Sequence, residues 1–120
     1  MNRAIAAMSA CLTLLVGACD RGSHIMRGEV DSLTYLCDQG AELAVRYLTP
    51  SQGPATATLT YDNKLITMHQ EPAASGVLFV ADKGYPDYRW HTKGQEGMLV
   101  LYSSNDKDGN VLLGGCTTPD

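Results

Sequence analysis

The fold class of this chain is decided by the stretch 55-ATATLTYDNKLITMHQ-70. Apolar Ala57, Leu59 and Tyr61 alternate with threonines, which is the period-two pattern of a β-strand with one buried face. Asp62-Asn63 follows, two residues that tolerate left-handed backbone conformations and are typical of a tight hairpin turn. We therefore expect antiparallel neighbouring strands over residues 55–61 and 64–70.

Similar short alternating runs extend in both directions along the chain. The clearest covers residues 41–48, where Leu43, Val45 and Tyr47 are expected to face inward. Further strands are expected at 33–37, 76–81, 85–91, 97–103 and 110–116, with a loop at 105–109. No run keeps a helical period for long, and about eight short, evenly spaced strands favour an all-β fold, a small antiparallel β-barrel in which closure removes unpaired edges.

Residues 1–18 are expected to be a lipoprotein signal peptide, because the basic Arg3 precedes an apolar run and two small residues. The run is shorter than the roughly 20 residues of a membrane-spanning helix, and no other stretch is apolar enough to be one. The sequence Val16-Gly17-Ala18-Cys19 resembles a bacterial lipobox, which predicts a lipid on Cys19. Ordinary secretory cleavage after Ala18 is the alternative, since Val16 and Ala18 also suit a small-x-small cleavage site.

Residues 19–31 are expected to be a lipidated, flexible tether, because they contain glycine and serine and show no hydrophobic period. Several acyl chains, each buried methylene contributing about 0.8 kcal/mol, would hold the chain at a membrane surface. This predicts a place in the bacterial cell envelope, anchored by lipid and facing the periplasm. Asp20 resembles a sorting signal for the inner membrane, although the choice between the inner and outer membrane stays open. Residues 22–26 also resemble a cloning remnant, and their origin stays open too.

Residues 32–120 are expected to form one small domain, whose own core leaves only a thin margin of stability. Of the four cysteines, Cys11 lies in the signal peptide and Cys19 is the candidate lipid site. Cys37 and Cys116 remain, one near each end of a domain in an oxidising compartment. We expect a disulfide between them that joins the first and last strands, worth roughly 4 to 5 kcal/mol in the chain-entropy model.

The mature chain is acidic. Removal of residues 1–18 takes away Arg3 and no acid, which leaves eight Lys and Arg against thirteen Asp and Glu, a formal net charge of −5. The electrostatic field of a negatively charged protein repels nucleic acid. The same field attracts a cationic partner and speeds its association. We therefore expect no nucleic-acid partner.

The sequence offers little support for an enzymatic function. The three histidines, His24, His69 and His91, come without a nucleophile motif or metal-ligand spacing. The acidic segment 106–110 lacks the ligand pattern of a calcium loop and is expected to be a surface turn. His69 is expected to be a solvent-facing strand residue. We predict a protein that is not an enzyme and that needs neither a metal nor a cofactor.

Two short motifs point to a function. Ser75-Gly76 is followed by an aromatic residue, Phe79, and Lys93-Gly94 is preceded by Trp90 and followed by Met98-Leu99. Tyr35-Leu36-Cys37 opens the domain and Cys116 closes it. In this combination the chain resembles the MliC/PliC family, the membrane-bound and periplasmic inhibitors of c-type lysozyme, over nearly the whole domain.

The resemblance implies c-type lysozyme as the partner. Ser75 and Lys93 would enter the lysozyme active-site cleft side by side, and Gly76 and Gly94 would shape their loops. Phe79 and Trp90 are further candidate binding residues, and Trp90 suits either the core or the rim of the binding surface. That cleft holds two carboxyl groups, one protonated and one ionised. A lysine ammonium offers three donors and a positive charge, and a serine hydroxyl both donates and accepts.

Three departures from the family pattern bear on this interpretation. Phe79 stands where the family usually has tyrosine, the segment 82–87 is longer than usual, and Trp90 lies one position farther from Lys93. The longer segment bears on the Ser75 to Lys93 spacing, and each of these two residues alone also suits an ordinary turn. The alternative function is an envelope lipoprotein of the same fold that binds a cell-wall glycan or an envelope assembly partner.

Overall fold

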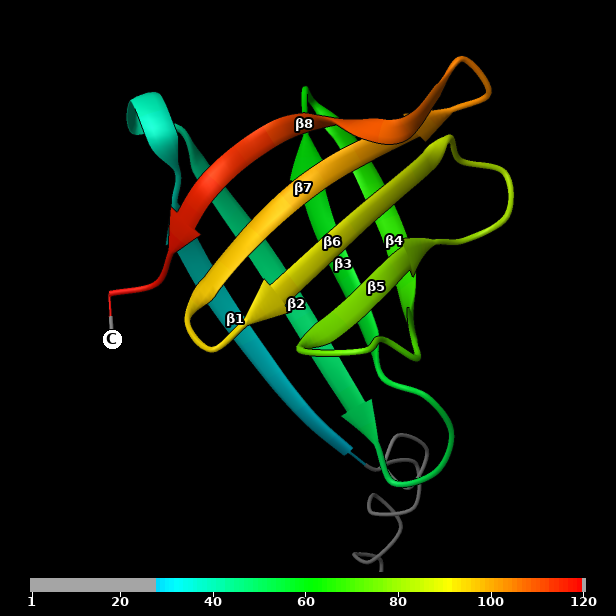
Figure 1. The fold of residues 1–120 in the computed structure, drawn as a ribbon. Coiled ribbons are helices and arrows are strands. Elements are labelled where there is room, and N and C mark those ends of the chain that lie inside the picture. The colour runs from blue at the N-terminus through cyan, green and yellow to red at the C-terminus, as the bar shows by residue number, and fades with distance from the viewer. Residues whose placement is uncertain (1–27, 120) are drawn as a thin grey trace, which may run out of the picture.

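The computed structural model describes residues 28–119, which form a closed antiparallel barrel with its strands in chain order (Figure 1). The expected signal peptide 1–18, the expected lipidation site Cys19 and residues 19–27 of the expected tether lie outside the described residues. The expected all-β barrel of about eight strands is confirmed. The elements are β1 (Gly28–Leu36), η2 (Asp38–Gly40), β2 (Glu42–Pro50), β3 (Thr56–Tyr61), β4 (Lys64–Glu71), β5 (Val77–Ala81), β6 (Asp87–Lys93), β7 (Glu96–Ser103) and β8 (Asp106–Thr117).

The stretch that decides the fold class has the expected structure. Strands β3 and β4 pair from Thr56 to Tyr61, and the turn between them consists of Asp62 and Asn63. Both turn residues have positive φ, 54° and 62°, as a two-residue hairpin of type I′ requires. Aspartate and asparagine adopt this conformation more readily than other non-glycine residues, so the local sequence fixes the register of the hairpin.

Two strands are longer than expected. β1 begins at Gly28, so residues 28–31, which we expected in the tether, pair with the end of β2. β8 begins at Asp106, because Ser104 and Asn105 form a tight turn and Ser103 pairs with Asp106. The expected loop at 105–109 is therefore mostly strand. Both extensions are largely exposed, so they lack the apolar alternation by which a half-buried strand is recognised.

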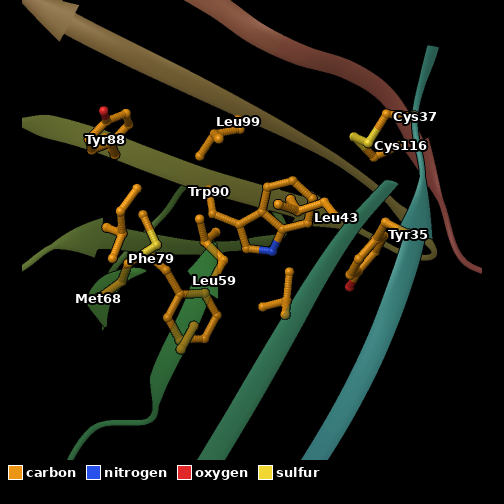
Figure 2. Packing of buried hydrophobic residues seen from close by; sticks show 13 residues of the cluster. Tyr35, Cys37, Leu43, Leu59, Met68, Phe79, Tyr88, Trp90, Leu99 and Cys116 are labelled. Atoms are coloured by element: carbon orange, nitrogen blue, oxygen red, sulfur yellow. A yellow bond between two sulfur atoms is a disulfide. The ribbon is translucent and has the colours of Figure 1, made fainter. Parts of the chain in front are cut away.

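The barrel interior holds the inward-facing residues of the alternating runs, with Trp90 at its centre (Figure 2). The Trp90 side chain is fully buried, and its Nε1–H donates to the Tyr47 hydroxyl across 2.7 Å. That hydroxyl also lies 2.9 Å from the hydroxyl of Tyr35. Burial is the main cause that raises the pKa of Tyr47, so the phenol stays protonated. This chain of three polar atoms satisfies the tryptophan donor inside an otherwise apolar core.

The barrel closes through a narrow seam. β1 and β8 share one backbone pairing, Leu36 with Thr117, whereas β1 pairs with β2 along its whole length. The disulfide between Cys37 and Cys116 lies directly beside this pairing. The expected bridge between the first and last strands is confirmed, and it fastens the seam where the hydrogen-bonded ladder is shortest.

Candidate functional site

The two motifs meet at one end of the barrel. Residues 72–76 connect β4 to β5, and the turn at residues 94–95 connects β6 to β7 at the same end (Figure 1). Val77 pairs with Thr92, so the residue after Gly76 lies opposite the residue before Lys93. The antiparallel pairing of β5 and β6 therefore brings together motifs that are far apart in the sequence.

The longer segment between the motifs does not separate them. Residues 82–86 connect the other ends of β5 and β6, on the opposite side of the barrel from the motif loops (Figure 1). Extra length there leaves the register of the two strands unchanged, because pairing is set by the strands themselves. The Ser75 to Lys93 juxtaposition thus survives this departure from the family pattern.

Gly76 packs directly against the end of β6. Its φ is 71°, and a Cβ built on it would clash with the carbonyl oxygen of Thr92. The same Cβ would lie 3.3 Å from the Cβ of Lys93 and 3.2 Å from Nε2 of His91. Glycine serves two purposes here, because it adopts the left-handed conformation and leaves room for the neighbouring backbone.

His91 ties the serine loop to β6. Its Nε2 lies 2.9 Å from the carbonyl oxygen of Ser75, and because a carbonyl only accepts, Nε2 carries the hydrogen and donates. Sequence reasoning missed this contact. The available signal was that His91 and Lys93 lie two positions apart in a strand, so both side chains point to one face. We assign His91 as a positioning residue for the Ser75 loop.

The lysine loop is a tight hairpin. Lys93 pairs with Glu96, and Gly94 occupies the first of the two turn positions with a φ of 63°, as hairpins of type II′ prefer. The side chains of Ser75 and Lys93 are both exposed. Within residues 28–119 the structure shows no salt bridge of Lys93, so its ammonium group is available to a partner.

Two expected binding residues are corrected by the structure. Phe79 is only 3% exposed and Trp90 is fully buried, so neither side chain belongs to the outer surface that carries Ser75 and Lys93. Phe79 lies at the bottom of a pocket at the end of the barrel, and Trp90 does not line that pocket. The two residues face each other across β5 and β6. Both point into the barrel because they alternate with outward-facing residues, and their contribution is to hold the strands that carry the motifs.

A shallow groove runs along the outer surface beside the motifs. Ser75, Leu78, His91 and Met98 contribute to a hollow of about 290 Å³ over β5 to β7. A second hollow of about 290 Å³ shares His91 and Met98 and reaches Lys93. Met98 is 39% exposed, so the motif that includes it presents apolar surface next to a hydroxyl and an ammonium group.

His69 lies in a separate polar cluster on the outside of β4. Its Nδ1 is 2.7 Å from a carboxylate oxygen of Asp82, and its Nε2 is 2.8 Å from one of Glu71. The hydrogen bond with Asp82, followed by that with Glu71, raises the pKa of His69 above its ordinary value. The expectation of a solvent-facing residue is confirmed, and the cluster holds β4 to the end of β5.

Residues 28–119 contain no group of three or more His, Cys, Asp or Glu side chains arranged to hold a metal ion. The same residues form no helix with the length and hydropathy needed to cross a bilayer.

Comparison with known proteins identifies a family. A family model described as "Membrane-bound lysozyme-inhibitor of c-type lysozyme" (MliC) matches residues 35–108, which include both motifs. A membrane-bound lysozyme inhibitor of C-type lysozyme from Cupriavidus necator is 30% identical over 102 residues, with 78% of this chain and 77% of that protein covered.

Two solved structures share the fold. The periplasmic inhibitor of C-type lysozyme from Salmonella typhimurium, PliC-St, has a TM-score of 0.66 and 29% identity, with coverage of 77% of this chain and 100% of that chain. Pseudomonas aeruginosa MliC, solved in complex with hen egg white lysozyme, has a TM-score of 0.55 and 25% identity, with coverage of 92% and 99%. The chain therefore belongs to the MliC family of inhibitors of c-type lysozyme, which are binding proteins rather than enzymes.

Proposed function

We propose that this chain inhibits c-type lysozyme by placing Ser75 and Lys93 together in the enzyme's active-site cleft. The observation that carries the proposal is the packing of Gly76 on Thr92 and Lys93, which makes the two loops one surface. The matched family and the relative solved with hen egg white lysozyme support lysozyme as the partner. Protection of peptidoglycan follows, because an occupied cleft admits no polysaccharide.

The chemistry of the cleft suits these two groups. One carboxylate of the lysozyme is ionised and attracts the Lys93 ammonium, while the protonated carboxyl can donate to the Ser75 hydroxyl. In a desolvated interface a close charge pair is worth about 1.5 kcal/mol or more, equivalent to about tenfold or more in affinity. A net charge of −5 for residues 19–120 adds long-range attraction to a basic enzyme.

Titration of lysozyme activity with purified Lys93→Ala and Ser75→Ala variants tests the proposal. Lys93→Ala should raise the inhibition constant by about tenfold or more, and Ser75→Ala should raise it less, because a neutral hydrogen bond is weaker. Lys64→Ala is the matched control, since Lys64 is an exposed lysine beside the turn at the other end of the barrel. Unchanged inhibition by Lys93→Ala would remove this lysine from the site.

Inhibition assays against different classes of lysozyme distinguish the proposed function from the alternative function. The wild-type chain should inhibit c-type lysozyme and leave g-type and i-type lysozymes active. Capture of a cell-wall glycan or an envelope protein without inhibition of c-type lysozyme would favour the alternative lipoprotein function.

We further propose that Cys19 carries the lipid that holds the inhibitor at an envelope membrane. The membrane-bound description of the family and the lipobox sequence support this anchor. Intact mass and palmitate labelling of the full chain should show acylation, which Cys19→Ser should abolish. Absence of label on the wild-type chain would make the protein a soluble periplasmic form.

A further inference from the structure

The barrel is open at the end that carries the motif loops. A pocket of about 340 Å³ lies there, and we call it the barrel mouth. Val77 and Thr92, which adjoin Gly76 and Lys93, line this pocket, together with Asp31 of β1. A partner bound to the two loops therefore also covers the barrel mouth.

The barrel mouth is built from one inward-facing layer of side chains above the core. Thr49 and Thr92 lie two residues beyond the inward-facing rings of β2 and β6, so strand alternation points them into the opening. Asp31 pairs with Tyr47, so its side chain lies on the same face of the sheet as that ring. Below them, Tyr47 and Phe79 form the floor, with ring centroids 5.5 Å apart. The opening is therefore polar and its floor is aromatic.

The chemistry of the barrel mouth suits a cation. Asp31 supplies a carboxylate, Thr49 and Thr92 supply hydroxyl acceptors, and Gln70 supplies an amide oxygen. No lysine or arginine lines the pocket, and Asp31 makes no salt bridge within residues 28–119. Aromatic rings below a carboxylate favour a guanidinium over an ammonium group, because the planar guanidinium has five donors and stacks on ring faces.

We propose that the barrel mouth receives an arginine side chain of the lysozyme while Ser75 and Lys93 occupy the enzyme's cleft. This inference rests on the proposed function and adds a second charged contact. The inhibitor supplies the positive group in the first contact, Lys93, and the negative group in the second, Asp31. Lysozymes are typically basic and the mature inhibitor carries −5, so the charges of the two partners are complementary. The volume of the barrel mouth lies within the range of small-ligand pockets.

Asp31→Asn tests the contact by removing the charge while keeping the shape of the side chain. Asp62→Asn is the matched control, because Asp62 lies in the turn at the opposite end and asparagine tolerates its positive φ. Both substitutions lower the negative net charge by one, so their effects on long-range attraction are similar. We expect Asp31→Asn to weaken lysozyme binding by about tenfold and Asp62→Asn by less than about twofold, measured by calorimetry.

A second measurement probes the barrel mouth without lysozyme. N-acetyl-arginine amide, titrated into the labelled wild-type chain, should shift the amide NMR signals of Val77 and Thr92. The shifts should be lost in Asp31→Asn, whose unchanged spectrum elsewhere would show an intact fold. No shift with the arginine probe, or shifts only with a trimer of N-acetylglucosamine, would overturn the inference, and the second result would indicate a glycan site.

The results distinguish failure of the arginine contact from failure of the proposed function. If Lys93→Ala abolishes inhibition while Asp31→Asn and Asp62→Asn bind lysozyme equally, the arginine contact is wrong and the proposed function stands. If the wild-type chain does not inhibit lysozyme, the proposed function is wrong. The arginine contact with lysozyme is then wrong as well, and the NMR titration shows whether the barrel mouth binds a guanidinium at all.

Discussion

Replacing Gly76 with alanine tests the packing that makes the two loops one surface. An alanine held at a φ of 71° costs about 1–2 kcal/mol through its left-handed conformation. The new methyl group would also clash with the carbonyl oxygen of Thr92. That oxygen belongs to a paired strand and cannot rotate away, so overpacking adds about 1–3 kcal/mol. We expect Gly76→Ala to lower the free energy of unfolding by about 2–5 kcal/mol in total.

Gly94→Ala separates the two contributions. Gly94 has a φ of 63°, close to that of Gly76, but nothing lies within 4 Å of a Cβ built on it. Its replacement therefore carries only the conformational cost of about 1–2 kcal/mol. Gly94→Asn should cost less than Gly94→Ala, because asparagine adopts left-handed conformations more readily.

Urea unfolding and lysozyme inhibition, measured on the same samples, complete the test. Gly76→Ala should be less stable than Gly94→Ala, and below its unfolding transition it should inhibit lysozyme about tenfold more weakly than wild type. The inhibition loss follows because the Ser75 loop must move away from Lys93 to admit the methyl group, and interface contacts of this kind are worth about 1.4 kcal/mol or more. Equal stability of the two alanine variants would refute the close contact between Gly76 and β6.

Three further predictions concern the framework. The double variant Cys37→Ser/Cys116→Ser should lose about 4 kcal/mol of stability to urea, because the bridge spans 79 residues and fastens the shortest ladder; a loss below about 1 kcal/mol would argue against this role. Tyr47→Phe removes the acceptor of a fully buried indole N–H and should cost about 1–3 kcal/mol, whereas Tyr61→Phe, with no side-chain hydrogen bond in the described structure, should cost little. His69→Gln should destabilise the chain more at about pH 5.5 than at about pH 9, because the pKa of His69 in the folded chain is raised above 6.5. The charged imidazole stabilises the fold fully at pH values below the pKa of His69 in the unfolded chain. This stabilisation is lost as the pH rises through the pKa of His69 in the folded chain. Thermal unfolding that shows the same His69→Gln difference at both pH values would contradict this assignment.

The sequence predicted most reliably the parts of the fold whose physical cause is local. The Asp62-Asn63 turn is specified by two residues that accept positive φ, and its flanking strands by alternation over a half-buried face. Residues 28–31 were misplaced in the tether for the converse reason. That part of β1 is exposed on both faces, so its pairing with β2 leaves no apolar period to detect.

Long-range contacts explain the misassigned site residues. Phe79 and Trp90 belong to the motif patterns on which the prediction of binding residues rests, whereas the barrel points both side chains inward. The hydrogen bond from His91 to the carbonyl of Ser75 joins residues 16 positions apart and depends on the register of β5 against β6. No single strand encodes that register, because it emerges only when both strands pack on a common core.

The core of this barrel therefore supports the proposed inhibitory surface. The Trp90 indole fits against Gly97 of β7, where an added Cβ would lie 2.6 Å from a ring carbon, and its N–H binds Tyr47 of β2. Thr92 and Lys93 follow on the same strand, so fixing Trp90 fixes the backbone on which the Gly76 loop packs. A rigid strand avoids the loss of conformational entropy that a flexible loop would undergo on binding. Variants that loosen Trp90 should consequently weaken inhibition even though its side chain is buried inside the barrel.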